Sequence, residues 1–168
     1  MSGEAPDNPG VIAPPPLIYA GVLAVGLAAK RFFARQGRFA NRPYVPVSFL
    51  PPALSRALGW PLVIGGLAIG LLGFREMRRA GTNVDPRVPT TAIVTGGPYR
   101  FTRNPLYVGK TLMYAGIAAR ANALPAMMLL PLVLHIMRRG VIEREEAYLE
   151  RKFGDEYLDY KSRVRRWI

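Results

Sequence analysis

The sequence predicts an all-α, polytopic integral membrane protein with about four transmembrane helices, and two observations lead to that fold class. Half of the 168 residues are apolar, and they gather in blocks instead of recurring with the period of a soluble helix or strand. Lysine and arginine number 23 against 11 acidic residues, a net charge of +12, and they concentrate between the blocks. Nucleic-acid-binding proteins share this charge, but positive residues beside apolar spans are typical of membrane proteins.

The chain is expected to begin with a flexible segment and a short first span. Residues 1–16 are small, polar and proline-rich, which predicts a disordered or extended segment. Residues 17–29 are apolar and predict the first membrane helix, although they fall short of the ~20 residues that a straight span needs. A basic, proline-containing connection follows over 30–56.

Residues 57–74 are the clearest span. Gly66 and Gly70 stand there in GxxxG spacing, which predicts close packing of two helices. The charged stretch 75–104 that follows contains "TTAIVTGG", a short β-branched run. A single strand without a partner would leave backbone groups unsatisfied, so we predict an ordered extended loop.

A helical hairpin and an amphipathic tail are predicted for the C-terminal part. Two apolar segments, 105–119 and 123–137, are separated only by residues 120–122, which predicts a tight turn. From Val141 onward apolar residues recur at steps of three or four among many charges, which predicts an amphipathic helical tail. Gly154 is expected to end one helix of this tail before Asp155 begins the next.

The distribution of positive charge predicts the orientation. Lysine and arginine are dense in 75–110 and after 137 and sparse in the turn near 120, so the central loop and the tail should be cytoplasmic. Four spans then place the N-terminus on the same side. The basic residues of 30–56 would lie outside, against the rule, and the side of that connection remains open.

Two polar clusters flank the predicted hairpin. One offers hydrogen-bond donors and the other acidic acceptors, and a hairpin returns both to one side of the membrane. The first consists of Tyr99, Arg100, Arg103, Asn104 and Tyr107, and the second of Glu143, Glu145, Glu146 and Glu150. The alternative is that such charges are solvated or bind lipid phosphates, an interpretation that we adopt for Arg75, Arg78, Arg79, Arg138 and Arg139.

Several kinds of chemistry are excluded by composition. The chain has no cysteine, and its one histidine, His135, cannot build a zinc site alone. No metal is therefore expected. We expect His135 to be buried in the last span, in packing or an interhelical hydrogen bond rather than in catalysis. No G-x-G-x-x-G follows a predicted strand, so the usual nucleotide-binding fold is not an option.

The stretch "GPYRFTRNPLYVG", followed after the hairpin by "EREEAYLERKFGDEYLDYKSRVRRW", resembles the membrane methyltransferases of the isoprenylcysteine carboxyl methyltransferase and phospholipid N-methyltransferase superfamily. The resemblance covers residues 81–168. It implies an enzyme that depends on S-adenosylmethionine and binds it at the cytoplasmic end of the last helices. It also implies a single methyltransferase domain over 17–168, with the cofactor site in 81–168.

The resemblance also implies site residues. The cofactor-lining segment corresponds to Thr91, Ala92, Ile93 and Val94, the family's tyrosine to Tyr99, its R-H-P-x-Y motif to Arg103, Asn104, Pro105, Leu106 and Tyr107, and its acidic pair to Glu145 and Glu146. Glu145 suits the cofactor's ammonium and the arginine-bearing loop its carboxylate. Tyr99 or Tyr107 could contact the sulfonium or the adenine. Arg103, Asn104 and Tyr107 are the expected catalytic residues.

Three departures from the family pattern affect the expected substrate. Asn104 stands in place of a histidine, Thr91 in place of another, and Val141 in place of an arginine thought to meet the substrate. The cofactor site therefore looks retained, whereas the part specific for prenylcysteine does not. A lipophilic acceptor entering from the bilayer is expected, and its identity stays open.

The function predicted from the sequence is thus an S-adenosylmethionine-dependent methyltransferase of a bacterial inner membrane, with membrane lipids as its surroundings. The alternative is a non-catalytic helical membrane module that binds anionic lipid through its basic surface. Nucleic-acid binding is not expected, because the positive charge already has a membrane explanation. The oligomeric state is open, since a GxxxG pair also serves packing within one chain.

Overall fold

The computed structural model describes residues 7–39 and 48–168, and all regular structure in these ranges is helical. The first two helices are α1 (Pro15–Phe39) and α2 (Pro52–Arg79), and a single 3-10 turn follows at Gly97–Arg100. The remaining elements are α3 (Pro105–Arg120), α4 (Leu124–Met128), α5 (Leu130–Met137), a π-helical segment (Arg138–Ile142), α6 (Glu143–Phe153) and α7 (Asp155–Arg163). The predicted all-α class is confirmed.

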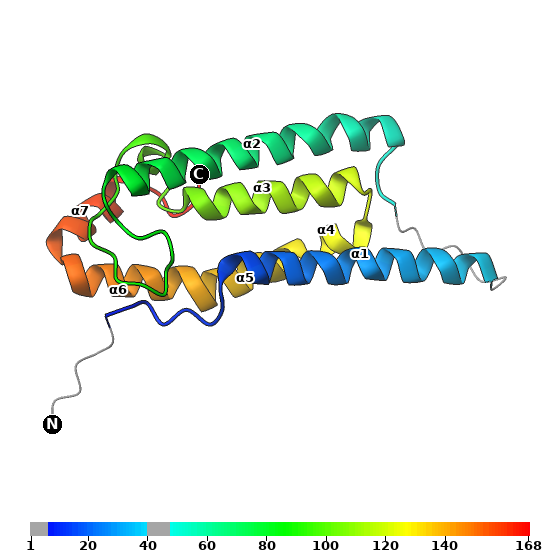
Figure 1. The fold of residues 1–168 in the computed structure, drawn as a ribbon. Coiled ribbons are helices and arrows are strands. Elements are labelled where there is room, and N and C mark those ends of the chain that lie inside the picture. Colours follow the sequence, from blue (N-terminus) through cyan, green and yellow to red (C-terminus); the bar gives the residue numbers. More distant parts are fainter. Residues whose placement is uncertain (1–6, 40–47) are drawn as a thin grey trace, which may run out of the picture.

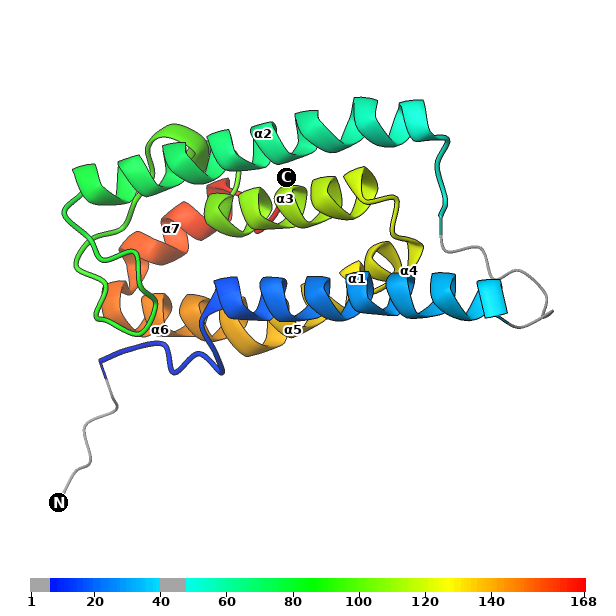
Figure 2. The same cartoon turned by 45° about the vertical axis from the view of Figure 1, so that its right-hand side comes forward.

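The helices form an elongated antiparallel bundle (Figure 1). α1 runs away from the end where the N-terminal segment lies, α2 returns, α3 runs away again, and α4 to α6 return (Figures 1 and 2). The loop between α2 and α3, the α6–α7 corner and the described N-terminal residues therefore gather at one end of the bundle, which we call the loop end, and the C-terminus lies beside the first turns of α3. The turn at 120–122 lies at the opposite end, as the predicted hairpin requires.

Helix bounds differ from the predicted spans because apolar content marks only the part of a helix that prefers lipid. α1 continues through Lys30, Arg31 and Arg35, and α2 exceeds the predicted 57–74 at both ends. The predicted fourth span, 123–137, is the first half of one continuous helix, Leu124–Phe153. Arginine, lysine and glutamate are good helix formers, so a charged composition does not end a helix.

Within residues 7–39 and 48–168, three helices are long and apolar enough to cross a membrane: Pro15–Gln36, Pro52–Arg79 and Leu124–Phe153. α3 has 16 residues, about 24 Å at 1.5 Å per residue. This is shorter than the ~30 Å hydrocarbon core of a typical bilayer. The count of four spans therefore stays a prediction, although the chain runs along the bundle four times.

Glycine contacts let α2 and α3 lie backbone to backbone. A Cβ at Gly66 would meet the Gly109 carbonyl oxygen at 2.5 Å, and one at Gly116 would meet the Gly59 carbonyl oxygen at 2.8 Å. Gly70 has open space where its own Cβ would stand, but a Cβ at Gly109 would meet the Gly70 nitrogen at 3.0 Å, so both glycines of the expected GxxxG pair lie at the close approach to α3. Gly59, Gly66 and Gly73 of α2 all pack against α3. They are seven residues apart, and seven residues return a helix to nearly the same face.

The apolar core lies between α1, α3 and α5. Its largest fully buried side chains include Tyr114, Val133 and Met137. Tyr19 of α1 meets the Tyr114 ring edge-on at a centroid distance of 6.4 Å. These contacts fix how α3 and α5 are rotated about their own axes. The rotation in turn decides which of their side chains are directed toward the loop end.

Two segments close the loop end. Residues 7–14 contain no helix and contact the last helices, with the Ile12 amide donating to the Gly140 carbonyl oxygen at 3.2 Å. Residues 1–6 lie outside the described residues, so the predicted disorder stays a prediction. Gly154 adopts φ +54° between α6 and α7, as expected, and α7 then leads the chain back to the start of α3.

Candidate cofactor site

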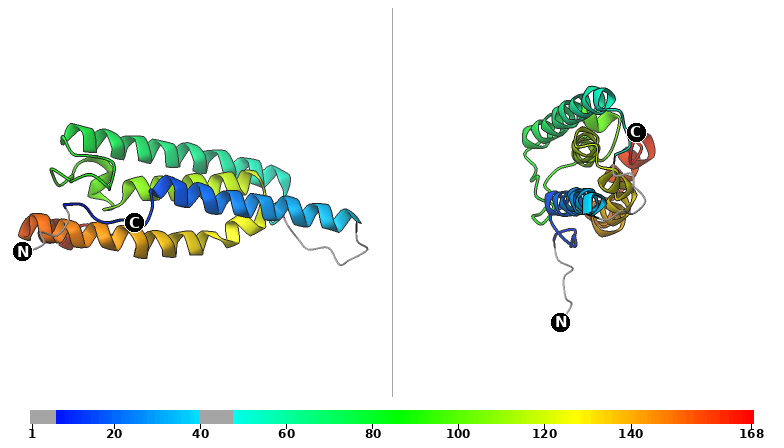
Figure 3. Two further views of the ribbon diagram at one scale, coloured as in Figure 1. Left: turned by 60° about the horizontal axis from the view of Figure 1, so that its bottom comes forward. Right: turned by 90° about the vertical axis from the view of Figure 1, so that its right-hand side faces the viewer.

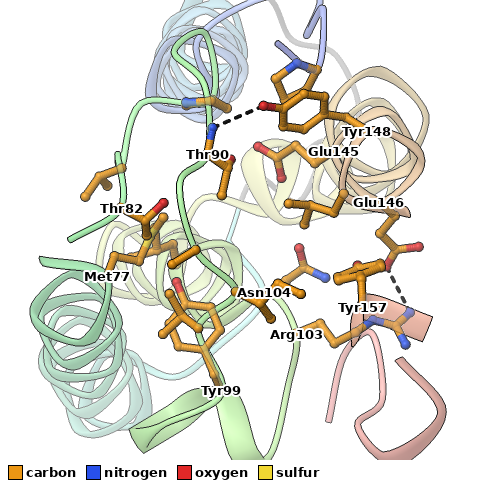
Figure 4. Close-up of a pocket in the computed structure, with 18 of the residues that line it drawn as sticks. Met77, Thr82, Thr90, Tyr99, Arg103, Asn104, Glu145, Glu146, Tyr148 and Tyr157 are labelled. Carbon is orange, nitrogen blue, oxygen red and sulfur yellow. Dashed lines mark hydrogen bonds and ion pairs between the residues drawn. The ribbon is translucent and has the colours of Figure 1, made fainter. Parts of the chain in front are cut away.

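A cavity at the loop end has about 820 Å³ of empty space, part of it open to solvent. Its walls come from the end of α2, the loop over 82–94, the start of α3, and α6 and α7 (Figure 4). Of the residues expected to bind cofactor or substrate, the cavity is lined by Ala92, Ile93, Val94, Tyr99, Arg103, Asn104, Pro105, Leu106, Tyr107, Glu145 and Glu146.

Thr91 is the one expected site residue that does not line this cavity. Its amide donates to the Thr82 hydroxyl at 3.0 Å, and its own hydroxyl donates to the Gly81 carbonyl oxygen at 2.9 Å. The side chain therefore holds the loop from outside. Its neighbours Thr90 and Ala92 line the cavity.

The start of α3 is built by Asn104 and Pro105. Pro105 is the first helical residue, where its missing N–H and fixed φ are tolerated. Asn104 is buried; its amide N–H donates to the Thr102 hydroxyl, and its side-chain Nδ2 donates to the Arg166 carbonyl oxygen at 3.0 Å. Asn104 thus joins the helix start to the C-terminal segment.

Arg103 and Glu146 form a buried ion pair, with Arg103 Nη2 at 2.9 Å from Glu146 Oε1 and side-chain exposures of 9% and 7%. Arg166 adds a second contact to Glu146, with Nη2 at 2.6 Å from Oε2. Arg103 Nη1 also donates to the carbonyl oxygens of Lys161 and Val164. The pair therefore holds the C-terminal segment against α3 and α6. Hydrogen bonding to Glu146 also raises the pKa of Arg166.

One donor of this cluster has no partner. Arg103 Nε is buried and makes no hydrogen bond within the described part of the chain. An orphaned buried N–H costs about 1–3 kcal/mol. Less than 1 Å² of this atom is accessible, so a bound molecule would reach it only if neighbouring groups moved.

Glu145 points into the cavity, whereas Glu146 points toward Arg103 (Figure 4). The Tyr107 hydroxyl donates to Glu145 Oε1 at 2.5 Å. Among the residues that the structure describes, Glu145 forms no ion pair, unlike Glu143, Glu146 and Glu150. The cavity thus holds an acidic group whose charge no arginine or lysine neutralises by direct contact.

Aromatic residues that the sequence did not single out for the site complete its walls. Tyr148, Tyr157 and Tyr160 line the cavity together with Met77 and Thr82. Tyr148 accepts a hydrogen bond from the Thr90 amide at 3.2 Å and so fixes the loop to α6. For Tyr157 and Tyr160, the step of three between them in the amphipathic tail was the available signal.

The phenols of Tyr99 and Tyr160 stay protonated at neutral pH, because the pKa of each is raised. Burial raises the pKa of Tyr99, and the charges of Tyr160 and Glu145 raise it further. Burial likewise raises the pKa of Tyr160 to about 12. The Tyr160 hydroxyl donates to the Tyr99 carbonyl oxygen at 2.8 Å, so these groups bind and orient rather than act as bases.

His135 is exposed rather than buried, which corrects the expectation from its sequence position. It lines a second, open hollow between α3 and α5, with Val108 and Thr111 on the facing helix. A residue two positions from Val133 lies about 200° around the helix from that core side chain, which explains the error. Among the described residues, no group of three or more His, Cys, Asp or Glu side chains could hold a metal ion.

A family model matches the segments of the chain that carry most of the residues lining the cavity. The model of the phospholipid methyltransferase family matches residues 54–156, from the first turn of α2 to the first turn of α7. The chain belongs to the phospholipid methyltransferase family. The resemblance inferred from the two motifs is therefore confirmed, and the helices that could cross a membrane agree with a membrane member of a methyltransferase family.

Three relatives of this phospholipid methyltransferase family member show how far the similarity extends. A Haemophilus influenzae protein, named only as uncharacterized, is 36% identical over 63 residues, which are 38% of this chain and 79% of that protein. The nickel-cobalt-cadmium resistance protein NccN of Alcaligenes xylosoxydans xylosoxydans is 35% identical over 75 residues, 45% of this chain and 35% of that protein. The protein-S-isoprenylcysteine O-methyltransferase of Schizosaccharomyces pombe is 36% identical over 72 residues, 43% of this chain and 30% of the enzyme.

The matched stretch therefore spans most of the first relative but only about a third of the other two. No solved structure gives a significant match to this chain.

Proposed function

We propose that this chain is an integral membrane methyltransferase that uses S-adenosylmethionine to methylate a lipophilic acceptor entering from the bilayer. We place the cavity on the cytoplasmic side, because positive residues concentrate at the loop end. One observation carries the proposal: a single cavity is lined both by Glu145 and by Arg103. Among the described residues, Glu145 has no ion-pair partner and the buried Nε–H of Arg103 has no acceptor.

The residues present fit this cofactor. Its amino-acid end carries an ammonium and a carboxylate, which match a free carboxylate and a free guanidinium donor. Glu145 would hold the ammonium, and Arg103 Nε would donate to the carboxylate. Ile93, Val94 and Leu106 line the cavity with apolar side chains, which exclude water. Contacts between charges are stronger where water is excluded, because the local dielectric constant is lower.

The remaining roles follow from the contacts of each residue. When bound, S-adenosylmethionine supplies an electrophilic methyl group on a positively charged sulfur. Tyr107, oriented by its hydrogen bond to Glu145, closes the membrane side of the cavity. Asn104 fixes the start of α3, and Tyr99 offers a protonated phenol to the bound molecule. Methyl transfer needs alignment more than proton transfer, and alignment alone can supply up to about 7–11 kcal/mol.

Binding of S-adenosylhomocysteine tests the proposal. Titration calorimetry of the protein in nanodiscs should detect binding, and Glu145→Gln should weaken it roughly 10- to 100-fold, the loss of a charge-assisted hydrogen bond. Glu156→Gln is the matched control, because Glu156 is exposed on α7 and lines no part of the cavity. No binding at millimolar ligand by a folded sample, or equal effects of both substitutions, would contradict the proposal.

Transfer of a labelled methyl group to an extract of the host's own membranes, followed by mass identification of the product, would name the acceptor.

The alternative function, a non-catalytic membrane module, predicts the opposite result in the binding test. Arg75, Arg78 and Arg79 are exposed at the end of α2, where anionic lipid could bind. That function would show no S-adenosylhomocysteine binding, and its lipid association would fall when these arginines are neutralised.

A further inference from the structure

Residues 7–12, which we call the N-terminal strap, contain no helix and lie along the last helices of the bundle (Figure 1). The strap runs antiparallel to them and makes hydrogen bonds at successive turns, to Gly140, Arg144 and Tyr148. The family model begins at residue 54, so the strap lies outside the part of the chain that this model matches. Its role therefore has to be argued from the contacts of this chain.

The strap forms part of the cavity wall. Pro9 lines the cavity, as does Thr90 of the loop over 82–94. The buried Tyr148 donates its hydroxyl hydrogen to Asp7 Oδ1 at 2.8 Å, and the Thr90 amide donates to the same hydroxyl oxygen (Figure 4). Two segments that line the cavity are thus joined at a single hydroxyl group of α6.

The N-terminal end of the strap is held by exposed contacts. Lys152 Nζ lies 2.7 Å from Asp7 Oδ1, and the Asp7 and Lys152 side chains are 61% and 28% exposed. Exposed ion pairs add little to stability, because water screens their charges and both side chains lose freedom. Asp7 can therefore leave α6 at a small cost in free energy.

Gly10 separates this end from an anchored part. It adopts φ +60°, a conformation that is open to glycine and rare for other residues. On its C-terminal side, Val11 packs against the apolar core and Ile12 packs against Gly140. Residues at such a boundary absorb the backbone change when a lid opens, so Gly10 stands at the position of a hinge.

We propose that the N-terminal strap is a lid on the cavity: Asp7 holds it closed, Gly10 is its hinge, and its opening admits and releases S-adenosylmethionine. This inference rests on the proposed function. S-adenosylmethionine is charged and arrives from water, and the strap lies at the loop end, where such a molecule would enter. Asp7 is a positioning residue that acts through Tyr148 and Lys152.

The exchange rates of S-adenosylhomocysteine test the role of Asp7. Because one opening step precedes both entry and release, Asp7→Asn should raise the association and the dissociation rate constants together, about 2- to 5-fold, the factor that an exposed ion pair represents. Kd should stay unchanged. Asp159→Asn is the matched control, since its exposed partner is Arg163 and neither residue lines the cavity. Surface plasmon resonance on immobilised nanodiscs measures both rate constants.

A second variant tests the hinge without altering a side chain of the cavity. In Gly10→Ala no described atom would lie within 4 Å of the new Cβ, but the left-handed backbone conformation would be strained. This disfavours the closed strap, so both rate constants should rise about 5-fold or more. Gly21→Ala in α1 is the matched control, because it has the same open space without a positive φ.

A cross-link tests the closed position directly. The natural chain has no cysteine, so Asp7→Cys combined with Lys152→Cys provides a single pair for a short bifunctional thiol reagent with a reducible spacer. Cross-linking should lower both rate constants about 10-fold or more, because the population of the open lid falls, and reduction should restore them. Formation of the cross-link does not depend on the ligand and reports where the strap lies.

Three results would overturn the lid: unchanged rate constants in both Asp7→Asn and Gly10→Ala, unchanged exchange in the cross-linked protein, or no cross-link at all. A weaker Kd with an unchanged association rate constant would also contradict it, because Pro9 would then be a fixed part of the wall. A wild type that binds no S-adenosylhomocysteine, in a protein whose double-cysteine variant forms the cross-link, would instead refute the proposed function.

Discussion

Glu145 and Glu146 are adjacent in the sequence and have different surroundings. Successive helical residues point about 100° apart, so Glu146 meets Arg103 and Arg166 while Glu145 faces the cavity. The sequence assigned both glutamates to the cofactor. Because both oxygens of Glu146 bind arginines, we now assign Glu146 to holding the C-terminal segment and Glu145 to the ligand.

The Arg103–Glu146 pair should show strong energetic coupling. Arg103→Met should lower the free energy of unfolding by about 3 kcal/mol, because it leaves a buried acid with one partner fewer. Combining it with Glu146→Gln should cost less than the sum of the two single changes, by about 1–3 kcal/mol. Unfolding in mixed detergent measures all four variants.

The exposed pair Arg79 and Glu76 provides the matched control, with side-chain exposures of 57% and 21%. Its coupling should stay below about 1 kcal/mol. Additive effects at Arg103 and Glu146 would show that the buried contact is not formed.

At the scale of elements, α2 and α3 pack through glycines that no single local motif reveals. The repeat by seven in α2 matches Gly109 and Gly116, also seven apart, in α3. The GxxxG spacing describes glycines within one helix. The contact between α2 and α3 depends on the register of the two helices against each other, which a motif within one helix does not give. Close packing here also holds the start of α3, and with it Tyr107, at the cavity.

Gly109→Ala should separate α2 from α3. The new Cβ would lie 2.6 Å from the Gly66 carbonyl oxygen and 3.0 Å from the Gly70 nitrogen, both backbone atoms that cannot move alone. We expect a loss of about 1–3 kcal/mol in stability, measured by thermal unfolding in detergent. Gly65→Ala, in the same bundle with no atom within 4 Å of its Cβ, should leave stability unchanged or raise it slightly. Equal stability of the two variants would contradict the close contact.

On the scale of the whole molecule, the antiparallel passes bring distant segments to one end. Asp7 bonds to Tyr148 and Lys152, the loop over 82–94 bonds to α6 through Thr90, and the C-terminal segment bonds to Arg103. The cavity therefore depends on every part of the chain that reaches the loop end. Its side of the membrane follows from charge density alone and needs a direct measurement.

Single cysteines can establish the orientation, because the chain has none of its own. Thr95→Cys lies exposed in the loop at the cavity, and Ser48→Cys lies exposed before α2 at the opposite end. In intact bacterial cells a membrane-impermeant maleimide should label Ser48→Cys and should reach Thr95→Cys only after permeabilisation. The reverse pattern would place the cavity outside and favour the basic residues of 30–56 as the cytoplasmic signal.

The amino-acid sequence alone predicts the helical class, the hairpin, the extended loop and the family, because apolar blocks, turn residues and two spaced motifs are properties of the linear chain. It also identified all but one of its expected site residues as neighbours of one cavity, Thr91 being the exception. The packing of the helices was needed to show which glutamate faces that cavity, that Tyr148, Tyr157 and Tyr160 complete it, and that His135 is exposed. Those outcomes depend on the rotation of each helix about its axis and on the return of the C-terminal segment, and both are set by contacts between residues far apart in the chain.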